Sequence, residues 1–251
     1  MPSSNLKPLV SRLSRLSGLD VGVLFSGGKD SCYALWYVIH QGWRVQTLIT
    51  VRSANPESYL FHYPNVRWVE AQARALRLPV RFIDSSGVRD EEVNDLRRGL
   101  EEVIGELRLQ GLVSGVVASD YQKSRVDRLC EELKLASFTP LWRKDPFLLL
   151  REEVEVGFEI IVTACMAMGL GREWLGSRLT PQNVLKLKSL SEKYGFNPAF
   201  EGGEAETFVL DAPFFHERLE VLRHRVSWDG FSGRYVIEDL QASPKPARPR
   251  R

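Results

Sequence analysis

The chain has 251 residues, of which 43% are hydrophobic, and its 34 basic and 32 acidic side chains nearly balance. Disordered proteins combine low hydrophobicity with high net charge, so this composition predicts a folded protein, and its length allows one large domain or two lobes. No apolar run approaches the roughly 20 residues of a membrane-spanning helix. We therefore expect a cytoplasmic protein with no membrane contact, and the even charge favours no direct contact with nucleic acid.

Three cysteines, Cys32, Cys130 and Cys165, are too few and too widely spaced for a disulfide framework or a zinc site. They are expected to be buried thiols.

Apolar runs and amphipathic stripes alternate along the first 142 residues. The predicted strands are 21–25, 44–51, 79–84, 112–118 and 136–142. The first predicted helix begins at Ser31, and three further helices are predicted over 65–76, 90–110 and 126–135. Strands that alternate with helices build a parallel sheet covered on both faces. The first part of the chain is therefore expected to be an α/β domain of the kind that binds nucleotides.

The alternation stops after Trp142. A helix over 146–156, a strand over 159–164, a helix over 181–194 and a hairpin of strands 219–228 and 234–240 are predicted there. We expect a parallel-sheet domain over 1–145 and a smaller α+β lobe over 146–240. The basic, proline-rich tail 241–251 is expected to be disordered.

The segment with the strongest chemical signal lies between the first predicted strand and the first predicted helix. It reads SGGKDS and consists of Ser26, Gly27, Gly28, Lys29, Asp30 and Ser31. Glycines allow positive φ and a close approach of the backbone, and a helix N-terminus directs N–H groups at an anion. The two serine hydroxyls and a solvated Lys29 add donors. The loop suits pyrophosphate; the alternative is a glycine-rich turn with an exposed lysine.

Two other phosphate-binding loops do not match. A Walker A loop needs a glycine five residues before its Gly-Lys pair and a Ser or Thr after it, where this chain has Val23 and Asp30. No G-x-G-x-x-G motif follows the first strand either. Neither a P-loop kinase nor a Rossmann dehydrogenase is favoured.

With its SGGKDS loop the chain resembles the N-type ATP pyrophosphatases, which split ATP into AMP and pyrophosphate. Two further segments, GVVASDYQKSR over 115–125 and EGGEAETFVLD over 201–211, resemble the signature segments of the diphthine ammonia ligase family. Phe61-His62 and Trp174-Leu175-Gly176 extend the likeness over most of residues 20–215. Ala205 departs from the aromatic residue that many relatives have at this position.

The resemblance implies an adenine nucleotide α-hydrolase-like (PP-loop) fold and a defined reaction. A carboxylate of diphthine, a modified histidine of elongation factor 2, would attack the α-phosphate of ATP to form an acyl-adenylate and release pyrophosphate. Ammonia would then displace AMP and leave diphthamide. No glutaminase is recognisable, so free ammonium is the expected nitrogen source. Mg²⁺ is expected with ATP, but the sequence assigns no metal ligand.

The acidic segment places three carboxylates within six residues. Its residues are Glu201, Gly202, Gly203, Glu204, Glu206 and Thr207. Spacing alone fits a solvated acidic loop equally well. With the resemblance, these residues are expected to bind the cationic substrate group or ammonium, Thr207 through its hydroxyl, and Glu201 and Glu204 join Lys29 and Asp30 as candidate catalytic residues.

A second group follows the strand that ends at Ala118, where ligands of parallel sheets gather. Gly115 and Asp120 are expected near the nucleotide, and Tyr121 and Arg125 near the substrate; alternatively, Arg125 pairs with Asp127 or Glu131 on a helix. His62 is expected to meet the adenosine or to be a packed loop histidine. The other histidines have no ligand spacing.

Two other functions stay open on the sequence. One is a different PP-loop ATP pyrophosphatase that thiolates or amidates tRNA or a metabolite, which the absence of a CxxC pair disfavours. The other is a non-catalytic adenine-nucleotide sensor on the same fold, which would not need Lys29, Asp30 and the acidic segment together.

Overall fold

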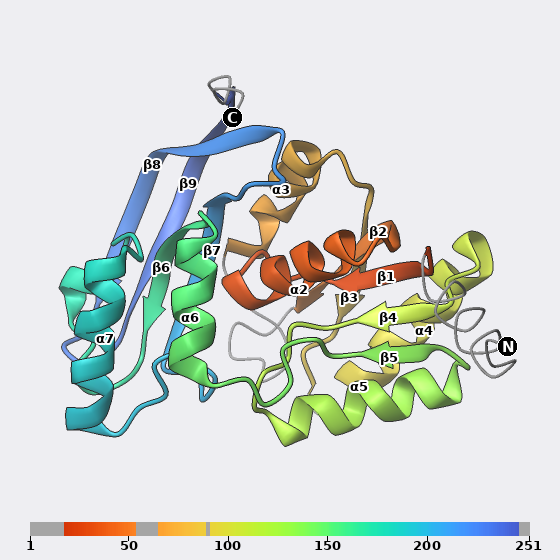
Figure 1. The fold of residues 1–251 in the computed structure, drawn as a ribbon, viewed down its shortest axis with the longest axis horizontal. Helices are drawn as coiled ribbons and strands as arrows, with labels where there is room; N and C mark the ends of the chain where they lie inside the picture. The colour runs from red at the N-terminus through yellow and green to blue at the C-terminus, as the bar shows by residue number, and fades with distance from the viewer. Residues whose placement is uncertain (1–17, 54–64, 89–90, 246–251) are drawn as a thin grey trace, which may run out of the picture.

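The computed structural model describes residues 18–53, 65–88 and 91–245. These residues form two sheets that lie side by side, with helices packed around them (Figure 1). No helix among them is both long and apolar enough to cross a membrane.

The first sheet is parallel and confirms the predicted α/β fold. Its strands are β1 (Asp20–Leu24), β2 (Arg44–Ser53), β3 (Val80–Ser85), β4 (Gly111–Val113) and β5 (Ala136–Phe138), in the order β3-β2-β1-β4-β5. After the central β1, the chain adds β2 and β3 on one side of it and then β4 and β5 on the other side. Ligands of such sheets bind beyond the carboxyl ends of the strands, at this switch point.

Helices cover both faces of this sheet. They are α2 (Lys29–His40), η1 (Asn65–Trp68), α3 (Val69–Leu76), α4 (Glu92–Leu107) and α5 (Asp120–Glu132). One core cluster joins Leu100 of α4 and Leu129 of α5 to the sheet. The other contains Leu35 of α2 and Ala75 of α3 and continues without a break into the second lobe.

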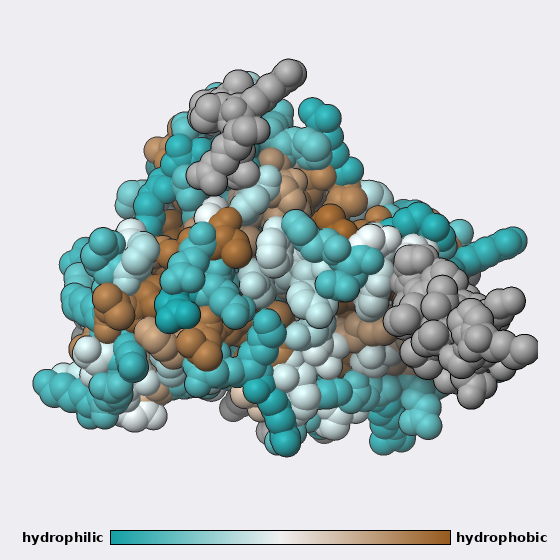
Figure 2. Space-filling view, viewed as in Figure 1, coloured by the Kyte–Doolittle hydropathy of each residue, from teal (hydrophilic) through white to brown (hydrophobic). Residues whose placement is uncertain are grey.

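The second sheet is antiparallel, with the order β7-β6-β9-β8. Its strands are β6 (Glu159–Cys165), β7 (Ala205–Asp211), β8 (Glu217–Trp228) and β9 (Gly233–Pro244), and its helices are α6 (Pro146–Glu155), η2 (Arg172–Trp174) and α7 (Pro181–Tyr194). Figure 2 shows hydrophobic side chains over α6 and α7, where Leu148 and Leu185 are exposed. The expectation of a smaller α+β lobe is confirmed.

The predicted bounds of four elements are corrected. Strands β4 and β5 are shorter than the apolar runs that predicted them, because they pair over three residues only and the buried Val116, Val117 and Leu141 belong to connections. Helix α5 begins at Asp120, six residues earlier than predicted, because the Ser119 side chain caps it by accepting from Gln122 N at 3.2 Å. Strand β9 continues to Pro244, so residues 241–244 are paired with β8 and only 246–251 of the tail lie outside the described residues.

Buried polar contacts join the two lobes. The Asn65 side chain donates to Tyr235 O at 2.9 Å and accepts from Ile237 N at 3.0 Å, and His216 N donates to Ala75 O at 2.7 Å. Helix α6 also faces α2, since the Tyr33 hydroxyl reaches Glu152 Oε2 at 3.3 Å. The carboxyl end of the parallel sheet therefore meets the second lobe directly.

Candidate functional site

The loop between β1 and α2 has the backbone that its sequence predicts. Gly27 has φ +81°, which a residue with a side chain rarely adopts, and a Cβ there would lie 2.4 Å from Gln72 Oε1. The two serine hydroxyls face each other at 3.2 Å, and Ser31 Oγ donates to Gly28 O at 3.0 Å. The two serines therefore hold the turn through hydrogen bonds within the loop.

Strand β7 of the second lobe is hydrogen-bonded to this loop. Thr207 Oγ1 accepts from Lys29 N, the first amide of α2, at 3.2 Å, and Val209 N donates to Gly27 O at 3.0 Å. The buried Gln72 side chain donates to Gly27 O and Val209 O at 3.0 and 2.8 Å. Thr207, predicted to bind substrate, thus occupies a helix N-terminal amide of the kind that binds anions.

Gly115 lies against the start of α2. A Cβ at this position would be 2.7 Å from Asp30 C and from Ser31 N, both backbone atoms. Any side chain would push the loop after β4 away from the SGGKDS turn. The structure therefore brings Gly115 to the predicted phosphate loop, and sterics explain why glycine stands there.

Lys29 is buried, and the expectation of a solvated lysine was wrong. Its side chain is 1% exposed, and Nζ lies 2.5 Å from Asp30 Oδ1 and 3.8 Å from Glu153 Oε2. Burial by itself would lower the pKa of Lys29, but the charges of Asp30, Glu153 and Glu201 raise it above its usual value. The ammonium is therefore firmly protonated and surrounded by carboxyl groups.

Glu153 of α6 is a member of this cluster that the sequence reasoning missed. It is 0% exposed and reaches Lys29 from the second lobe. A signal was present, because Glu153 follows Leu149 and Leu150 by four and three residues and all three are buried on one face of α6. A carboxylate in the apolar stripe of a helix indicates a buried acid.

Glu201 spans from the acidic segment to the loop after β4. Its Oε2 accepts from Val117 N at 3.3 Å and from Ala118 N at 3.1 Å. Burial, together with the charge of Asp30, raises the pKa of Glu201 to about 7, although Lys29 and the two amides act in the opposite direction. This carboxyl group therefore titrates near neutrality beside the phosphate loop.

Glu204 has a different environment. Its Oε1 accepts from Asn197 N at 2.9 Å and its Oε2 from Gly202 N at 2.7 Å, so both oxygens brace the turn before β7. Gly202 and Gly203 are exposed, and Gly203 has φ +82°. The structure separates the two candidate glutamates: Glu201 is in the cluster with Lys29, and Glu204 shapes the loop that carries it.

The remaining candidates on α5 have partners outside the cluster. Asp120 has an 82% exposed side chain and pairs with Arg143 at 3.8 Å. Arg125 stacks on Tyr121, with Cζ 3.4 Å from the ring centroid, and donates to Tyr121 O at 3.2 Å. The pairing of Arg125 with Asp127 is not observed, because Asp127 is bonded to Lys123 and Ser137.

Two further candidate residues complete the comparison. Glu206 lies on β7 opposite Ala164. His62 lies outside the described residues. All three cysteines are free and buried, as predicted.

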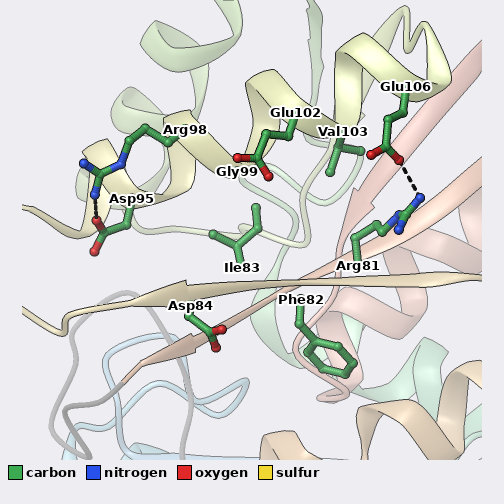
Figure 3. Close-up of a pocket in the computed structure, with 10 residues that line it drawn as sticks. All are labelled: Arg81, Phe82, Ile83, Asp84, Asp95, Arg98, Gly99, Glu102, Val103 and Glu106. Carbon is green, nitrogen blue, oxygen red and sulfur yellow. Dashed lines mark hydrogen bonds and ion pairs between the residues drawn. The ribbon is translucent and has the colours of Figure 1, made fainter.

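A surface hollow lies elsewhere, between β3 and α4 (Figure 3). Four of its charged side chains form two ion pairs, Arg81 with Glu106 and Arg98 with Asp95, each at 2.5 Å. Asp84 pairs with Arg52, which does not line the hollow, at 2.8 Å. Asp95 also accepts from Ser85 and Ser86, so it holds the end of β3. This hollow contains none of the predicted site residues.

Comparisons with known proteins identify the family of the chain. Residues 19–137 match the diphthamide synthase N-terminal domain, and residues 145–242 match the diphthamide synthase C-terminal domain. Proteins named diphthine–ammonia ligase are similar along most of the chain. The Danio rerio protein is 35% identical over 213 residues, which are 78% of this chain and 84% of that protein, and the Homo sapiens protein is 32% identical over 221 residues, 81% and 83% of the two. The chain therefore belongs to the diphthamide synthase family.

Proposed function

We propose that this protein amidates diphthine on elongation factor 2 to diphthamide, using ATP and ammonium and releasing AMP and pyrophosphate. Its family membership supports the reaction class, since relatives over most of the chain carry the name diphthine–ammonia ligase. The observation that carries the proposal is the junction of the two lobes. There the SGGKDS loop is bonded to Thr207, and Glu201 of the same acidic segment reaches the loop after β4.

The first step would join the substrate carboxylate to the nucleotide. A carboxylate oxygen attacks the α-phosphorus of ATP, the bond from that phosphorus to the bridging oxygen breaks, and pyrophosphate leaves with the electron pair. Negative charge grows on the leaving group, where the α2 N-terminus and the Lys29 ammonium stabilise it. For this the Lys29 side chain turns from Asp30 toward the phosphates.

The second step would replace AMP by nitrogen. The ammonium cation first gives one proton to water. The resulting ammonia attacks the acyl carbon, the bond to the AMP oxygen breaks, and a second proton leaves the nitrogen. A carboxyl group with a pKa of about 7, as Glu201 has, is suited to take that proton at neutral pH. Before this step the same carboxylate would attract the ammonium cation.

Mg²⁺ accompanies ATP in such reactions. Among the described residues, no group of three or more His, Cys, Asp or Glu side chains is arranged to hold a metal ion.

The proposal is tested by incubating the protein with ATP, ammonium and elongation factor 2 that carries diphthine. We expect equal amounts of AMP and pyrophosphate, and a mass change of the elongation factor that corresponds to conversion of a carboxylate to an amide. Glutamine in ammonium-free buffer should not replace ammonium. A nucleotide sensor would release no AMP, whereas a different PP-loop ligase would release AMP only with another acceptor; either result contradicts the proposal.

A further inference from the structure

Glu153 of α6 and Asp30 of the SGGKDS loop both lie beside the Lys29 ammonium, although they come from different lobes. Glu153 is 0% exposed, whereas the Asp30 side chain is 24% exposed. The acidic groups around Lys29 are Asp30, Glu153 and Glu201. Three ionised carboxylates around one ammonium would leave two negative charges uncompensated in a buried space, which is unfavourable. The cluster must therefore hold at least one proton on a carboxyl group.

The hydrogen bonds locate that proton. Among the residues that the structure describes, no N–H or O–H group donates to either carboxylate oxygen of Glu153, and Lys29 Nζ at 3.8 Å is beyond hydrogen-bond distance. A buried carboxylate without donors is costly, whereas a carboxylic acid has an O–H of its own to donate. Asp30 is the nearby acceptor. Burial, and then the charge of Asp30 and a hydrogen bond with it, raise the pKa of Glu153 well above its usual value, against the effect of Lys29.

Other titratable groups face Glu153. From α2 these are Lys29, Asp30, Cys32 and Tyr33, and from the acidic segment Glu201. Burial raises the pKa of both Cys32 and Tyr33, so neither contributes a charge at neutral pH. Glu201 is bonded to the amides of Val117 and Ala118 instead. Asp30 is thus the carboxylate that accepts from Lys29 on one side and lies beside Glu153 on the other.

We propose that Glu153 is a positioning residue: a neutral carboxylic acid that donates its proton to Asp30 and, through Asp30, sets the place of the Lys29 ammonium. The inference deepens the proposed function and rests on it where turnover is concerned. With Glu153 neutral, Lys29 has one ionised neighbour at close range instead of two, so the ammonium can leave Asp30 for the phosphates. Glu153 also transmits the position of α6, in the second lobe, to the phosphate loop of the first.

The proton itself is tested on the full-length protein without nucleotide. At about two pH units above the Glu201 pKa of about 7, where Glu201 is ionised, the infrared spectrum of the wild type should still contain the C=O stretch of a protonated carboxyl group, which Glu153→Gln removes. Glu152→Gln is the matched control, because Glu152 is the neighbouring residue of α6 and has donors in Tyr33 and Lys144. It should leave that band in place. If Glu153→Gln removes a carboxylate band instead, Glu153 is ionised and the proposal is wrong.

The positioning role is tested by whether the variant side chain can donate. Gln carries an N–H that can reach Asp30, whereas Leu fills the space without a donor. With ATP, ammonium and diphthine-bearing elongation factor 2, we expect Glu153→Leu to lower the rate of AMP release at saturating substrate at least tenfold, and Glu153→Gln to recover most of that loss. Equal rates for the two variants would overturn the role of the donated proton. Should Glu153→Leu not fold, Glu153→Met gives the same comparison.

The outcomes of these two experiments are independent of each other. The infrared result does not depend on what the enzyme acts on. If the wild type releases no AMP with this substrate, the proposed function is wrong, while the spectrum still decides whether Glu153 holds a proton.

Discussion

At the scale of single residues, the same residue type has different roles in this site because its surroundings differ. Glu153, Glu201 and Glu204 all lie near the junction of the lobes. Glu153 is buried without donors, Glu201 accepts two amide hydrogen bonds beside the cluster, and Glu204 has an amide on each oxygen. For Glu153 and Glu201, burial is the largest effect and raises the pKa of both groups. Only a structure reveals which condition applies to which glutamate.

Replacing Lys29 with Met tests the buried ammonium. Met keeps most of the length of the side chain but leaves the Asp30 carboxylate without its cation. We expect a loss of about 3 kcal/mol of unfolding free energy at neutral pH, as is typical when one partner of a buried ion pair is removed. The loss should be smaller at acidic pH, where the carboxyl groups are protonated. Urea unfolding at both pH values measures it; no loss at neutral pH would mean that Lys29 contributes no stability.

The same variant should also lose activity. Removal of one group that stabilises developing charge typically costs a factor of about 10²–10³ in rate. AMP release is the measurement, made at a temperature where the variant is folded. Release at the wild-type rate would exclude Lys29 from the phosphate chemistry.

Glu201→Gln should change the pH dependence of stability. The pKa of Glu201 rises on folding from about 4.5 to about 7, so between these values the native protein holds a proton that the unfolded chain has lost. Stability of the wild type therefore falls as pH rises through this range, by at most about 1.4 kcal/mol per pH unit from this group. Gln cannot ionise, so the stability of the variant should fall less than that of the wild type over the same pH range. Parallel curves for the two proteins, measured by urea unfolding, would contradict the assignment.

At the scale of elements, close backbone contacts place the loops of the site. Gly115 is the clearest case, because a Cβ would lie 2.7 Å from the backbone of Asp30 and Ser31. We expect Gly115→Ala to destabilise the protein by about 1–3 kcal/mol, the usual effect of overpacking, and to weaken ATP binding. Thermal unfolding and equilibrium ATP binding measure the two effects.

Gly105→Ala is the control for this variant. Gly105 lies in α4, and a Cβ there would meet nothing within 4 Å. Since Ala favours a helix more than Gly by up to about 1 kcal/mol, this variant should be at least as stable as the wild type and bind ATP normally. Equal effects of the two substitutions would exclude a specific role of Gly115.

Elements were predictable from sequence where the local signal and the tertiary structure agree. Helix α7 has the predicted bounds because Thr180 caps its start, Pro181 fits its first turn and Gly195 ends it with φ +77°. The phosphate loop was recognisable for the same reason. The bounds of β4 were not, because buried residues in a connection have the same hydrophobicity as a strand. The burial of Lys29 was also unpredictable, since α6 covers it from more than 100 residues further along the chain.

At the scale of the whole molecule, the two lobes share one core and several buried hydrogen bonds. Residues of α2 and β7 belong to the same hydrophobic cluster, and Gln72 and Asn65 each bond to the backbone of the second lobe. The site is made of both lobes: the phosphate loop comes from the first, and Thr207, Glu153 and Glu201 come from the second. If the proposed function is right, the junction of the lobes contributes to the chemistry as well as to stability.

Asn65→Ala tests whether the lobes unfold together. The substitution removes both hydrogen bonds of a buried side chain and leaves Tyr235 O and Ile237 N without these partners. An unsatisfied buried polar group costs about 1–3 kcal/mol, so the urea midpoint should fall while the slope of the transition stays unchanged. Asn183→Ala is the control, because that side chain donates to Arg178 O within the second lobe only, and it should shift the midpoint little. Tryptophan fluorescence and far-ultraviolet circular dichroism should follow one common transition in all three proteins. If Asn65→Ala instead gives two transitions, the junction depends on this one side chain, and the lobes are separate folding units held together at the site.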